Sequence, residues 1–318
     1  MGAAPLIALT GATGFVGRQL LEDLAQQSVN VRALARSLPG RPLPAAPSVN
    51  WIKGDLSSEA ALADLVRGAD TVIHLAGATK ARRADDFHRI NALSTADLVR
   101  HARLAGVRHF VHVSSLTAER PEVSDYAHSK AESETLAAEH AGEMALTIVR
   151  APAVLGPGDD ATQALFSALA RGLLPVPGGA AAGYRFSVID VADLSRFLLL
   201  LASGPDSNAR TITPAGHLNL GWSDIARSAE RIISRPIRRI DIPPLLMKMA
   251  GQAADVAVKL GGAPQVFSGG KVKELLSGDW IAGMQVPDAK SLDETLERCL
   301  MPFLSRPGDG RGIGKERA

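Results

Sequence analysis

The chain has 318 residues, of which 46% are hydrophobic and 21% charged, the composition of a globular protein with room for two lobes. Lysine and arginine outnumber aspartate and glutamate by only 35 to 33, which indicates neither nucleic acid nor an anionic membrane as a partner. The single cysteine, Cys299, can form no internal disulfide and leaves no cysteine cluster for zinc, so we expect a buried thiol in a reducing, cytoplasmic protein.

The apolar run Pro5–Leu9 has strand length and follows no basic segment, so we expect no secretory signal. The run Phe197–Ala202 is too short to span a bilayer, and we therefore expect no membrane insertion.

From residue 5 to about residue 150, short apolar runs alternate with amphipathic stretches, a pattern typical of a parallel sheet with crossover helices. Strands are predicted over Pro5–Thr10, Val29–Ala35, Asn50–Lys53, Thr71–Ala76, His109–Ser114 and Ala145–Val149. Helices are predicted over Phe15–Gln27, Ala60–Arg67, Asp85–Ala105 and Tyr126–Ala141, with Ser124 or Asp125 as the N-cap of the last.

After Arg150, prolines and glycines divide the chain into loops and short elements, which marks a second lobe. Helices are predicted there over 190–201, 222–234 and 244–260, with a loop-rich stretch at 261–270. The predicted fold is α/β: a doubly wound parallel Rossmann-type sheet with a smaller, mainly helical C-terminal substrate lobe. Its predicted parts are a dinucleotide-binding domain over 1–150 with part of 186–205 packing back on it, a substrate lobe over 151–305 and a flexible tail over 306–318.

A glycine-rich turn follows the first strand and opens the first helix. Backbone amides at the positive end of that helix can face a pyrophosphate, and glycine leaves the room that the turn and the phosphates need. This context predicts a cofactor-binding loop made of Thr10, Gly11, Thr13, Gly14, Phe15, Val16 and Gly17.

The second strand ends in Arg36, where proteins that prefer NAD place an acid to hold the ribose hydroxyls. A planar cation there suits a 2′-phosphate, so we predict NADP (NADPH) as the cofactor and NAD as the less favoured one. An exposed arginine in a turn is the competing interpretation. Asp55 and Leu56 follow the third strand and are predicted to lie near the adenine, although Asp55 could instead cap a helix. Ala76 and Gly77 end the fourth strand and are small enough for backbone to approach the cofactor, although a simple turn is the competing interpretation.

Tyr126 and Lys130 are four residues apart and therefore share one face of a helix. A nearby ammonium and the helix N-terminus both stabilise a phenolate, so we expect a lowered pKa for Tyr126 and a role as general acid or base. Ser115, at the end of the fifth strand, is predicted to hydrogen-bond the reacting oxygen, with Ser114 as the alternative.

These residues together resemble the extended branch of the short-chain dehydrogenase/reductase superfamily over about residues 5–200. The resemblance rests on Thr10-Gly11-x-x-Gly14-x-x-Gly17, Asp55-Leu56, Val113-Ser114-Ser115, Tyr126-x-x-x-Lys130 and the segment from Val149 to Gly158. It implies pyrophosphate binding by the three glycines and catalysis by Ser115, Tyr126 and Lys130, with Lys130 also on the nicotinamide ribose. The family's Arg-Pro pair stands here as Arg150-Ala151-Pro152, and Asn91 resembles the family's asparagine after the fourth strand.

Other polar residues favour structural interpretations. His109 and His112 have an odd spacing on a strand and point to opposite faces, and no carboxylate cluster stands out, so no metal is predicted. Asp190 and Asp193 resemble an acidic pair of the family and are interpreted mainly as helix-start carboxylates, with substrate contact as the alternative.

Three functions fit this pattern. The first is a reductase or dehydrogenase acting on a carbonyl or alcohol, and the second is a nucleotide-sugar epimerase with diphosphate-binding cations drawn from Arg185, Arg210, Arg238 and Arg239. Leu116-Thr117 stands where sugar dehydratases place acids, which disfavours dehydration. The third is a non-catalytic NADPH binder, because 114–117 and 274–279 also resemble the accessory subunit family of respiratory complex I. The expected partner is a small-molecule substrate rather than nucleic acid, and a homodimer is left open.

Overall fold

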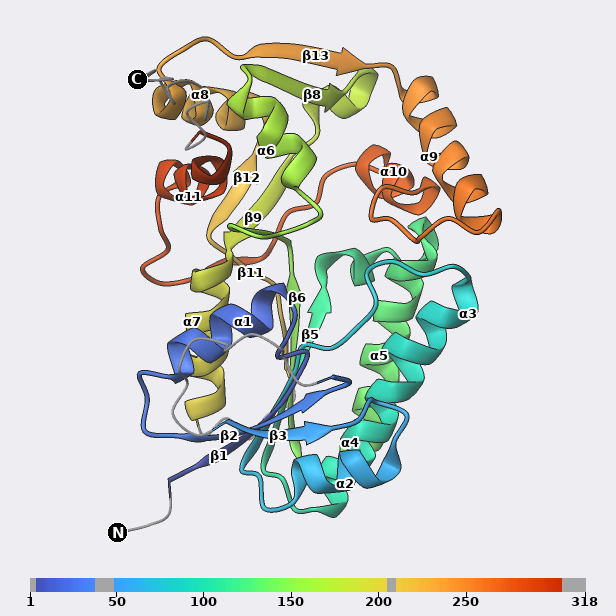
Figure 1. Ribbon diagram of the computed structural model, residues 1–318, viewed down its shortest axis with the longest axis vertical. Coiled ribbons are helices and arrows are strands. Elements are labelled where there is room, and N and C mark those ends of the chain that lie inside the picture. The colour runs from blue at the N-terminus through green and yellow to red at the C-terminus, as the bar shows by residue number, and fades with distance from the viewer. Residues whose placement is uncertain (1–3, 38–48, 205–209, 305–318) are drawn as a thin grey trace, which may run out of the picture.

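The computed structural model describes residues 4–37, 49–204 and 210–304. Its centre is a seven-stranded parallel sheet with strand order β10-β6-β5-β4-β1-β2-β3 (Figure 1). The strands are β1 (Leu6–Thr10), β2 (Asn30–Ala35), β3 (Val49–Lys53), β4 (Thr71–His74), β5 (His109–Ser115), β6 (Ala145–Ala151) and β10 (Arg210–Ile212). The predicted doubly wound fold and its six strands are confirmed, and β10 is a seventh strand that the sequence did not reveal.

Apolar side chains of the sheet are buried on both faces, as a parallel sheet requires. Helices α1 (Phe15–Leu24) and α7 (Val191–Ser203) cover one face, with Leu20, Leu21, Leu194 and Leu198 in a shared core. Helices α2 (Glu59–Val66), α4 (Ser94–Leu104) and α5 (Asp125–Ala141) cover the other. The sheet's strand order reverses between β1 and β4, so a crevice opens there at the carboxyl ends of the strands.

The single helix predicted over Asp85–Ala105 is three consecutive segments. They are α3 (Ala84–Phe87), the π-helical turn η1 (His88–Leu93) and α4. A π turn adds a residue to the helical repeat and turns a side chain to a new direction, a feature often found at functional sites.

The three helices predicted after Arg150 are present as α7, which packs on the central sheet, and as α8 (Trp222–Ile233) and α9 (Pro244–Lys259) in the second lobe. That lobe also contains α6 (Gln163–Ala170), α10 (Gly269–Leu276) and α11 (Leu292–Leu304), which were not predicted. Its short strands form three small sheets. One contains β7 (Ala153–Leu155), β9 (Phe186–Asp190) and β12 (His217–Leu220). The second pairs β8 (Leu173–Pro177) with β13 (Arg238–Ile242), and the third pairs β11 (Pro214–Ala215) with β14 (Met284–Gln285).

A separate core, with Phe166, Leu169, Leu174, Leu296 and Leu300 at its centre, holds this lobe together. Cys299 is buried in it, which raises the pKa of its thiol to about 12. No helix in the described ranges is both long and apolar enough to cross a bilayer. The predicted tail, 306–318, lies outside the described residues.

Candidate active site

The glycine-rich turn between β1 and α1 is sterically fixed at two of its three glycines. Gly11 has φ +72, and a Cβ on it would lie 2.7 Å from the backbone nitrogen of Ala76. A Cβ on Gly17 would lie 2.1 Å from the carbonyl oxygen of Gly11, so α1 can pack on the turn only without a side chain there. Gly14 differs, because its Cβ would make one contact of 3.2 Å, also with Gly11.

Helix α1 begins directly after Gly14, and no side chain caps its first turn, which also lacks an acidic residue. Amide groups at this end therefore keep their hydrogen-bonding capacity, and the helix dipole favours an anion. The turn thus has the geometry and charge that a pyrophosphate requires.

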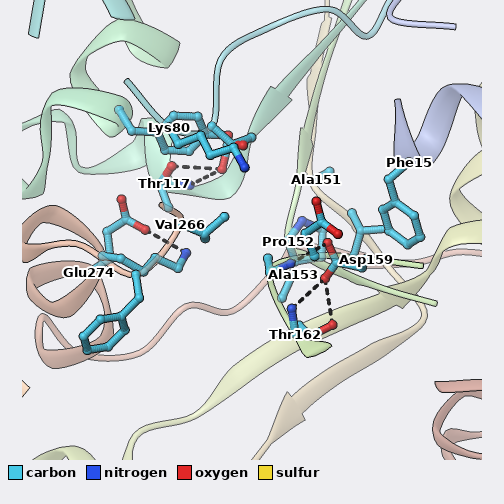
Figure 2. A pocket seen from close by; sticks show the side chains of 18 of the residues that line it. Phe15, Lys80, Thr117, Ala151, Pro152, Ala153, Asp159, Thr162, Val266 and Glu274 are labelled. Atoms are coloured by element: carbon cyan, nitrogen blue, oxygen red, sulfur yellow. Dashed lines mark hydrogen bonds and ion pairs between the residues drawn. The ribbon is translucent and has the colours of Figure 1, made fainter. Parts of the chain in front are cut away.

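A cavity of about 1770 Å³ extends from this turn to the second lobe. It exceeds the roughly 300–1,000 Å³ of a pocket for one small molecule, so a dinucleotide and a substrate can share it. Ten of the predicted site residues line it: Gly11, Thr13, Gly14, Phe15, Val16, Gly17, Gly77, Ser115, Tyr126 and Lys130. Figure 2 shows Phe15 and Asp159 on one side of this cavity, with Val266 and Glu274 on the other.

Five predicted cofactor residues do not line the cavity: Thr10, Arg36, Asp55, Leu56 and Ala76. Thr10 is buried; its hydroxyl pairs with Nδ1 of His74 at 2.6 Å and accepts a hydrogen bond of 3.2 Å from the amide of Ala76. Thr10 and Ala76 thus hold the ends of β1 and β4 together behind the turn.

Arg36 and Asp55 are exposed at the carboxyl ends of β2 and β3, beyond the edge of the cavity. Asp55 accepts hydrogen bonds from the hydroxyl and amide of Ser57, at 2.6 and 2.9 Å, which lower the pKa of its carboxyl; the charge of Arg36 adds to that effect. Helix α2 is capped by Ser58, not by Asp55.

Ser115, Tyr126 and Lys130 meet at the carboxyl end of β5. Ser115 ends that strand, and α5 begins one residue before Tyr126, with Ser124 as N-cap: its hydroxyl accepts a hydrogen bond of 3.0 Å from the amide of Ala127. Ser115 Oγ accepts hydrogen bonds from the amide and the hydroxyl of Thr117, at 3.2 and 2.9 Å, and the Ser115 hydroxyl lowers the pKa of Tyr126. Phe87 packs its edge on the Tyr126 ring, with the ring centroids 6.0 Å apart.

The lowered pKa expected for Tyr126 is not what this geometry gives. Burial raises the pKa of its phenol to about 12, the hydrogen bond from Ser115 opposes the rise, and the charge of Glu274 adds to it. The Nζ of Lys130 donates a hydrogen bond of 2.9 Å to the carbonyl oxygen of Val113 inside the protein. Burial lowers the pKa of Lys130 to about 8.

Glu134, one turn after Lys130, is a site residue that the sequence analysis missed. Its buried carboxylate accepts hydrogen bonds from Ser114 Oγ at 2.5 Å and from Arg150 at 2.7–3.1 Å, and its charge raises the pKa of Lys130. Arg150 therefore holds the Glu134 carboxylate beside Lys130. Ser114, the alternative to Ser115, turns to this pair. Glu134 lies four residues after Lys130 on α5, and that spacing was the available signal.

Asn91 lies in the π turn η1 and is buried. Its Oδ1 accepts a hydrogen bond of 2.7 Å from the amide of Ala78, and its Nδ2 donates to Ala78 O and to Ser129 Oγ, at 3.0 and 2.9 Å. It thus fixes the loop after β4, including Gly77, to α5.

The second lobe contacts the N-terminus of α5 through Glu274 on α10. Ser124 Oγ donates to Glu274 Oε1 at 2.6 Å, and Lys271 Nζ donates to Oε2 at 2.9 Å. Arg120, in the loop before α5, hydrogen-bonds Ser277 O at 2.8 Å and stacks over Trp280 at 4.0 Å from the ring centroid. The segment 274–279, noted in the sequence, therefore supports the N-terminus of α5.

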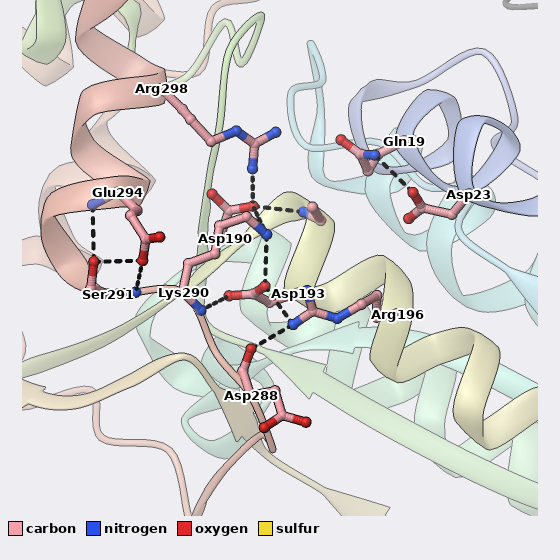
Figure 3. A network of polar contacts seen from close by, with 11 residues as sticks. Gln19, Asp23, Asp190, Asp193, Arg196, Asp288, Lys290, Ser291, Glu294 and Arg298 are labelled. Carbon is pink, nitrogen blue, oxygen red and sulfur yellow. Dashed lines mark hydrogen bonds and ion pairs between the residues drawn. The ribbon is translucent and has the colours of Figure 1, made fainter.

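Asp190 and Asp193 are buried at the start of α7, outside the cavity lining (Figure 3). Asp190 accepts a hydrogen bond of 2.8 Å from the amide of Ala192. It also forms an ion pair of 2.5 Å with Arg298, and Arg298 lines the cavity. Asp193 pairs with Lys290 at 3.0 Å and with Arg196 at 2.8 Å. The helix-start role is confirmed for Asp190, and both acids join α7 to the C-terminal segment.

His109 and His112 on β5 bond different neighbours, Thr147 and Ser133, at 2.9 and 2.8 Å. Within the described ranges, no three His, Cys, Asp or Glu side chains gather in a group able to hold a metal ion.

Comparison with known proteins places this geometry among nucleotide-dependent enzymes. The profile of the NAD dependent epimerase/dehydratase family matches residues 7–221. A ceramide reductase of Caulobacter vibrioides is 37% identical over 279 residues, which cover 87% of this chain and 86% of the relative.

A second relative is the 4-hydroxy-2-methyl-3-oxo-4-farnesyl-3,4-dihydroquinoline-1-oxide ketoreductase of Stigmatella aurantiaca. It is 30% identical over 233 residues, which cover 67% of this chain and 69% of the relative. Among solved structures, MoeE5 in complex with UDP-glucuronic acid and NAD superposes with a TM-score of 0.66 at 23% identity, covering 93% of this chain and 98% of that one. At that identity the likeness concerns the fold.

Proposed function

The chain belongs to the NAD-dependent epimerase/dehydratase family, in the extended branch of the short-chain dehydrogenases/reductases, and on that premise we propose that it is an NADP(H)-dependent carbonyl reductase of long-chain, lipid-like substrates. Family and relatives make it an NAD(P)-dependent oxidoreductase or epimerase. One observation carries the finer proposal: Ser115, Tyr126 and Lys130 line the same cavity as the glycine turn.

The glycine turn and the loop at Gly77 fit a dinucleotide because their glycines bring backbone to the cavity without a side chain, and the uncapped start of α1 offers amide groups to an anion. When bound, the nicotinamide supplies or accepts the hydride. The exposed guanidinium of Arg36, at the end of β2 with no acid beside it on that strand, favours a 2′-phosphate and hence NADPH.

Tyr126 holds its proton on Oη throughout the neutral range because the pKa of the phenol is raised to about 12. It is therefore prepared to donate that proton to the oxygen of a carbonyl substrate, which is the direction of reduction. Ser115 lines the cavity beside Tyr126, and its role in this proposal is to hydrogen-bond the same substrate oxygen. Lys130 lines the same cavity one helical turn after Tyr126, and its role in this proposal is to hold the ribose hydroxyls of the nicotinamide nucleotide.

The substrate half of the cavity is mainly apolar, which favours a hydrocarbon chain over a sugar nucleotide. Its second-lobe lining includes Leu165, Phe166, Val176, Ile225, Met247, Val258, Val266 and Leu275. The names of both relatives fit this lining, since ceramide and a farnesyl-bearing quinoline carry long hydrocarbon chains.

The cations suggested for a diphosphate do not gather around this half of the cavity. Of the four, Arg185 alone lines it, and its guanidinium bonds Asn219 at 2.6 and 3.2 Å. Arg238 and Arg239 are exposed on β13, and Arg210 is exposed on β10. The four arginines therefore lend no support to the nucleotide-sugar epimerase.

The test is NADPH consumption by the purified protein with three kinds of substrate: a long-chain 3-keto amide, a short water-soluble ketone and UDP-glucose. We expect the highest kcat/KM with the long-chain ketone and a stoichiometric alcohol product. Interconversion of the UDP-sugar without net NADPH oxidation, or binding of NADPH with no turnover of any ketone, would overturn the proposal.

A further inference from the structure

Helix α9 (Pro244–Lys259) presents apolar side chains to the surface. Leu245, Leu246, Met249, Val256 and the following Leu260 are 52–83% exposed. With the exposed Ala250, Ala253 and Ala257 they form what we call the α9 stripe: Leu245, Leu246, Met249, Ala250, Ala253, Val256, Ala257 and Leu260.

Helical geometry makes this stripe continuous. At 3.6 residues per turn, its eight members fall within an arc of about 140°, and no polar residue interrupts that arc. The opposite face of the helix is the one that packs on the protein. Met247 and Gly251 are buried there, and a Cβ on Gly251 would lie 3.0 Å from Gly269 Cα at the start of α10. The stripe is thus a second apolar face, where a surface helix normally carries polar residues.

The positive charges of α9 are exposed beside the stripe, whereas its negative charge points into the protein. Lys248 and Lys259 are exposed along one flank, on either side of Gln252. The acid of this helix, Asp255, turns inward and accepts hydrogen bonds of 3.1 and 3.2 Å from the amide of Gly269. Long lysine side chains beside an apolar face are typical of helices that lie at the surface of an anionic bilayer.

The same helix borders the cavity. Met247, Ala254 and Val258 on its inner face line the cavity, as do Val266 and Phe267 in the connection to α10. Phe267 is also 42% exposed, so the cavity reaches the surface beside the end of the stripe. Figure 1 shows α9 at the outer edge of the second lobe, with α10 between it and the catalytic helix α5.

The size of the stripe argues against a protein partner of the usual kind. Sixteen residues at 1.5 Å per residue give a length of about 24 Å, and a width of about 10 Å makes an area of roughly 240 Å². A stable protein interface buries about 800 Å² per partner. An interfacial helix needs no such minimum, because its binding grows with apolar area and with attraction to anionic lipids.

We propose that the α9 stripe docks the protein on a membrane surface with anionic head groups, with α9 in the plane of the interface and the Phe267 opening of the cavity facing the lipids. The net charge of the whole chain did not indicate a membrane partner. The apolar stripe and the flanking lysines of α9 do indicate one. The docking does not depend on the proposed function, whereas entry of the substrate from the bilayer rests on it.

Co-sedimentation with vesicles tests the docking without any turnover. The protein is mixed with vesicles of phosphatidylcholine alone and of phosphatidylcholine with phosphatidylglycerol. We expect binding to the anionic vesicles that weakens with salt, and a loss of at least tenfold in the double variant Leu246→Glu, Met249→Glu. Leu104→Glu on α4 and Leu200→Glu on α7 are matched controls, because those leucines are 74% and 61% exposed away from α9, and they should bind as the unchanged protein does.

Two results would overturn the proposal: no binding of the unchanged protein to either vesicle, or an equal loss in the control variants. A third is a smaller sedimentation coefficient of the double variant without lipid, which would show that a second copy of the chain covers the stripe. Oxidation of NADPH with a short water-soluble ketone, measured on the same proteins, reports separately on the proposed function and should not change in the double variant.

Discussion

Ser124 and Glu274 are 150 residues apart in the sequence, and a hydrogen bond of 2.6 Å joins their side chains. Ser124 at the same time caps α5 through the amide of Ala127. One hydroxyl therefore fixes the start of the catalytic helix and ties it to α10 of the second lobe. The position of Tyr126, two residues later, depends on both lobes.

Glu274→Ala should lower the free energy of unfolding by roughly 1–3 kcal/mol, because Ser124 and Lys271 both lose a buried, charged acceptor. Urea denaturation measures the change. Glu122→Ala is the control, since Glu122 is exposed nearby in the 3-10 turn η3 (Pro121–Val123), and its loss should change stability by less than about 0.5 kcal/mol. Equal effects of both substitutions would contradict the role of Glu274.

Tyr126→Phe should reduce kcat by about 100-fold or more while NADPH affinity stays within a factor of two, because only the hydroxyl that moves the proton is removed. Turnover and NADPH fluorescence titration are measured on the same preparation. Ser115→Ala should have a smaller effect in the same direction, since it removes the hydrogen bond to the phenol and leaves the proton donor. Turnover that survives in Tyr126→Phe would refute the assignment.

Arg36→Ala should weaken NADPH binding by about tenfold and leave NADH binding nearly unchanged. The reason is that the proposed partner of the guanidinium is the 2′-phosphate, which NADH lacks. Dissociation constants for both nucleotides decide the matter. Arg108→Ala is the matched control: Arg108 is exposed at the start of β5, at the opposite edge of the sheet, where it pairs with Asp70. Equal losses for NADPH and NADH in Arg36→Ala would remove the case for a phosphate contact.

Substitutions of two glycines in the turn should affect nucleotide binding and protein stability differently. In Gly14→Ala, the new methyl meets one atom, at 3.2 Å, so stability should fall by less than about 1 kcal/mol while NADPH affinity drops at least tenfold. In Gly17→Ala, the methyl would lie 2.1 Å from a carbonyl oxygen, which should cost about 1–3 kcal/mol of stability. Thermal unfolding and nucleotide titration of both variants check this contrast, and a Gly14→Ala protein that binds NADPH normally would contradict it.

The pH dependence of kcat/KM should show an alkaline limb near pH 8, where the free enzyme loses the proton of Lys130. The charge of Glu134 raises the pKa of Lys130, so Glu134→Gln should move this limb to lower pH. Ser114→Ala removes a hydrogen bond to Glu134 but keeps its charge, and Glu132→Gln removes a charge on the same helix that pairs with His88; both should leave the limb in place. A limb that moves equally in all three variants would argue against this coupling.

Much of the fold could be predicted because the strands of a parallel sheet are short, nearly continuous apolar runs. The six runs from Leu6 to Ala151 have that form, and each was found within two residues of its predicted bounds. Strand β10 escaped prediction because its three residues, Arg210–Ile212, have no periodicity of their own and gain their structure by pairing with β6.

The site could be predicted only as far as its local motifs reach. The Tyr126–Lys130 spacing and the glycine turn are contained in single segments of the chain. The contact of Glu274 with Ser124 depends on how the lobes pack, and the raised pKa of Tyr126 depends on burial, so neither has a local signal. The π turn that places Asn91 beside Ala78 could not be predicted from the sequence either, because its residues have ordinary helical character.

The pairing of β10 with β6 also has a consequence for the order in which the molecule is made. Residues 210–212 complete the edge of the nucleotide-binding sheet, and α7 covers one of its faces, yet α7 and β10 begin only some 40 and 60 residues after the end of β6. A nascent chain that ends soon after β6 therefore leaves a bare strand edge and an uncovered apolar surface, which are sites of aggregation. On the ribosome, the sheet can gain its last strand only after residue 212 has emerged.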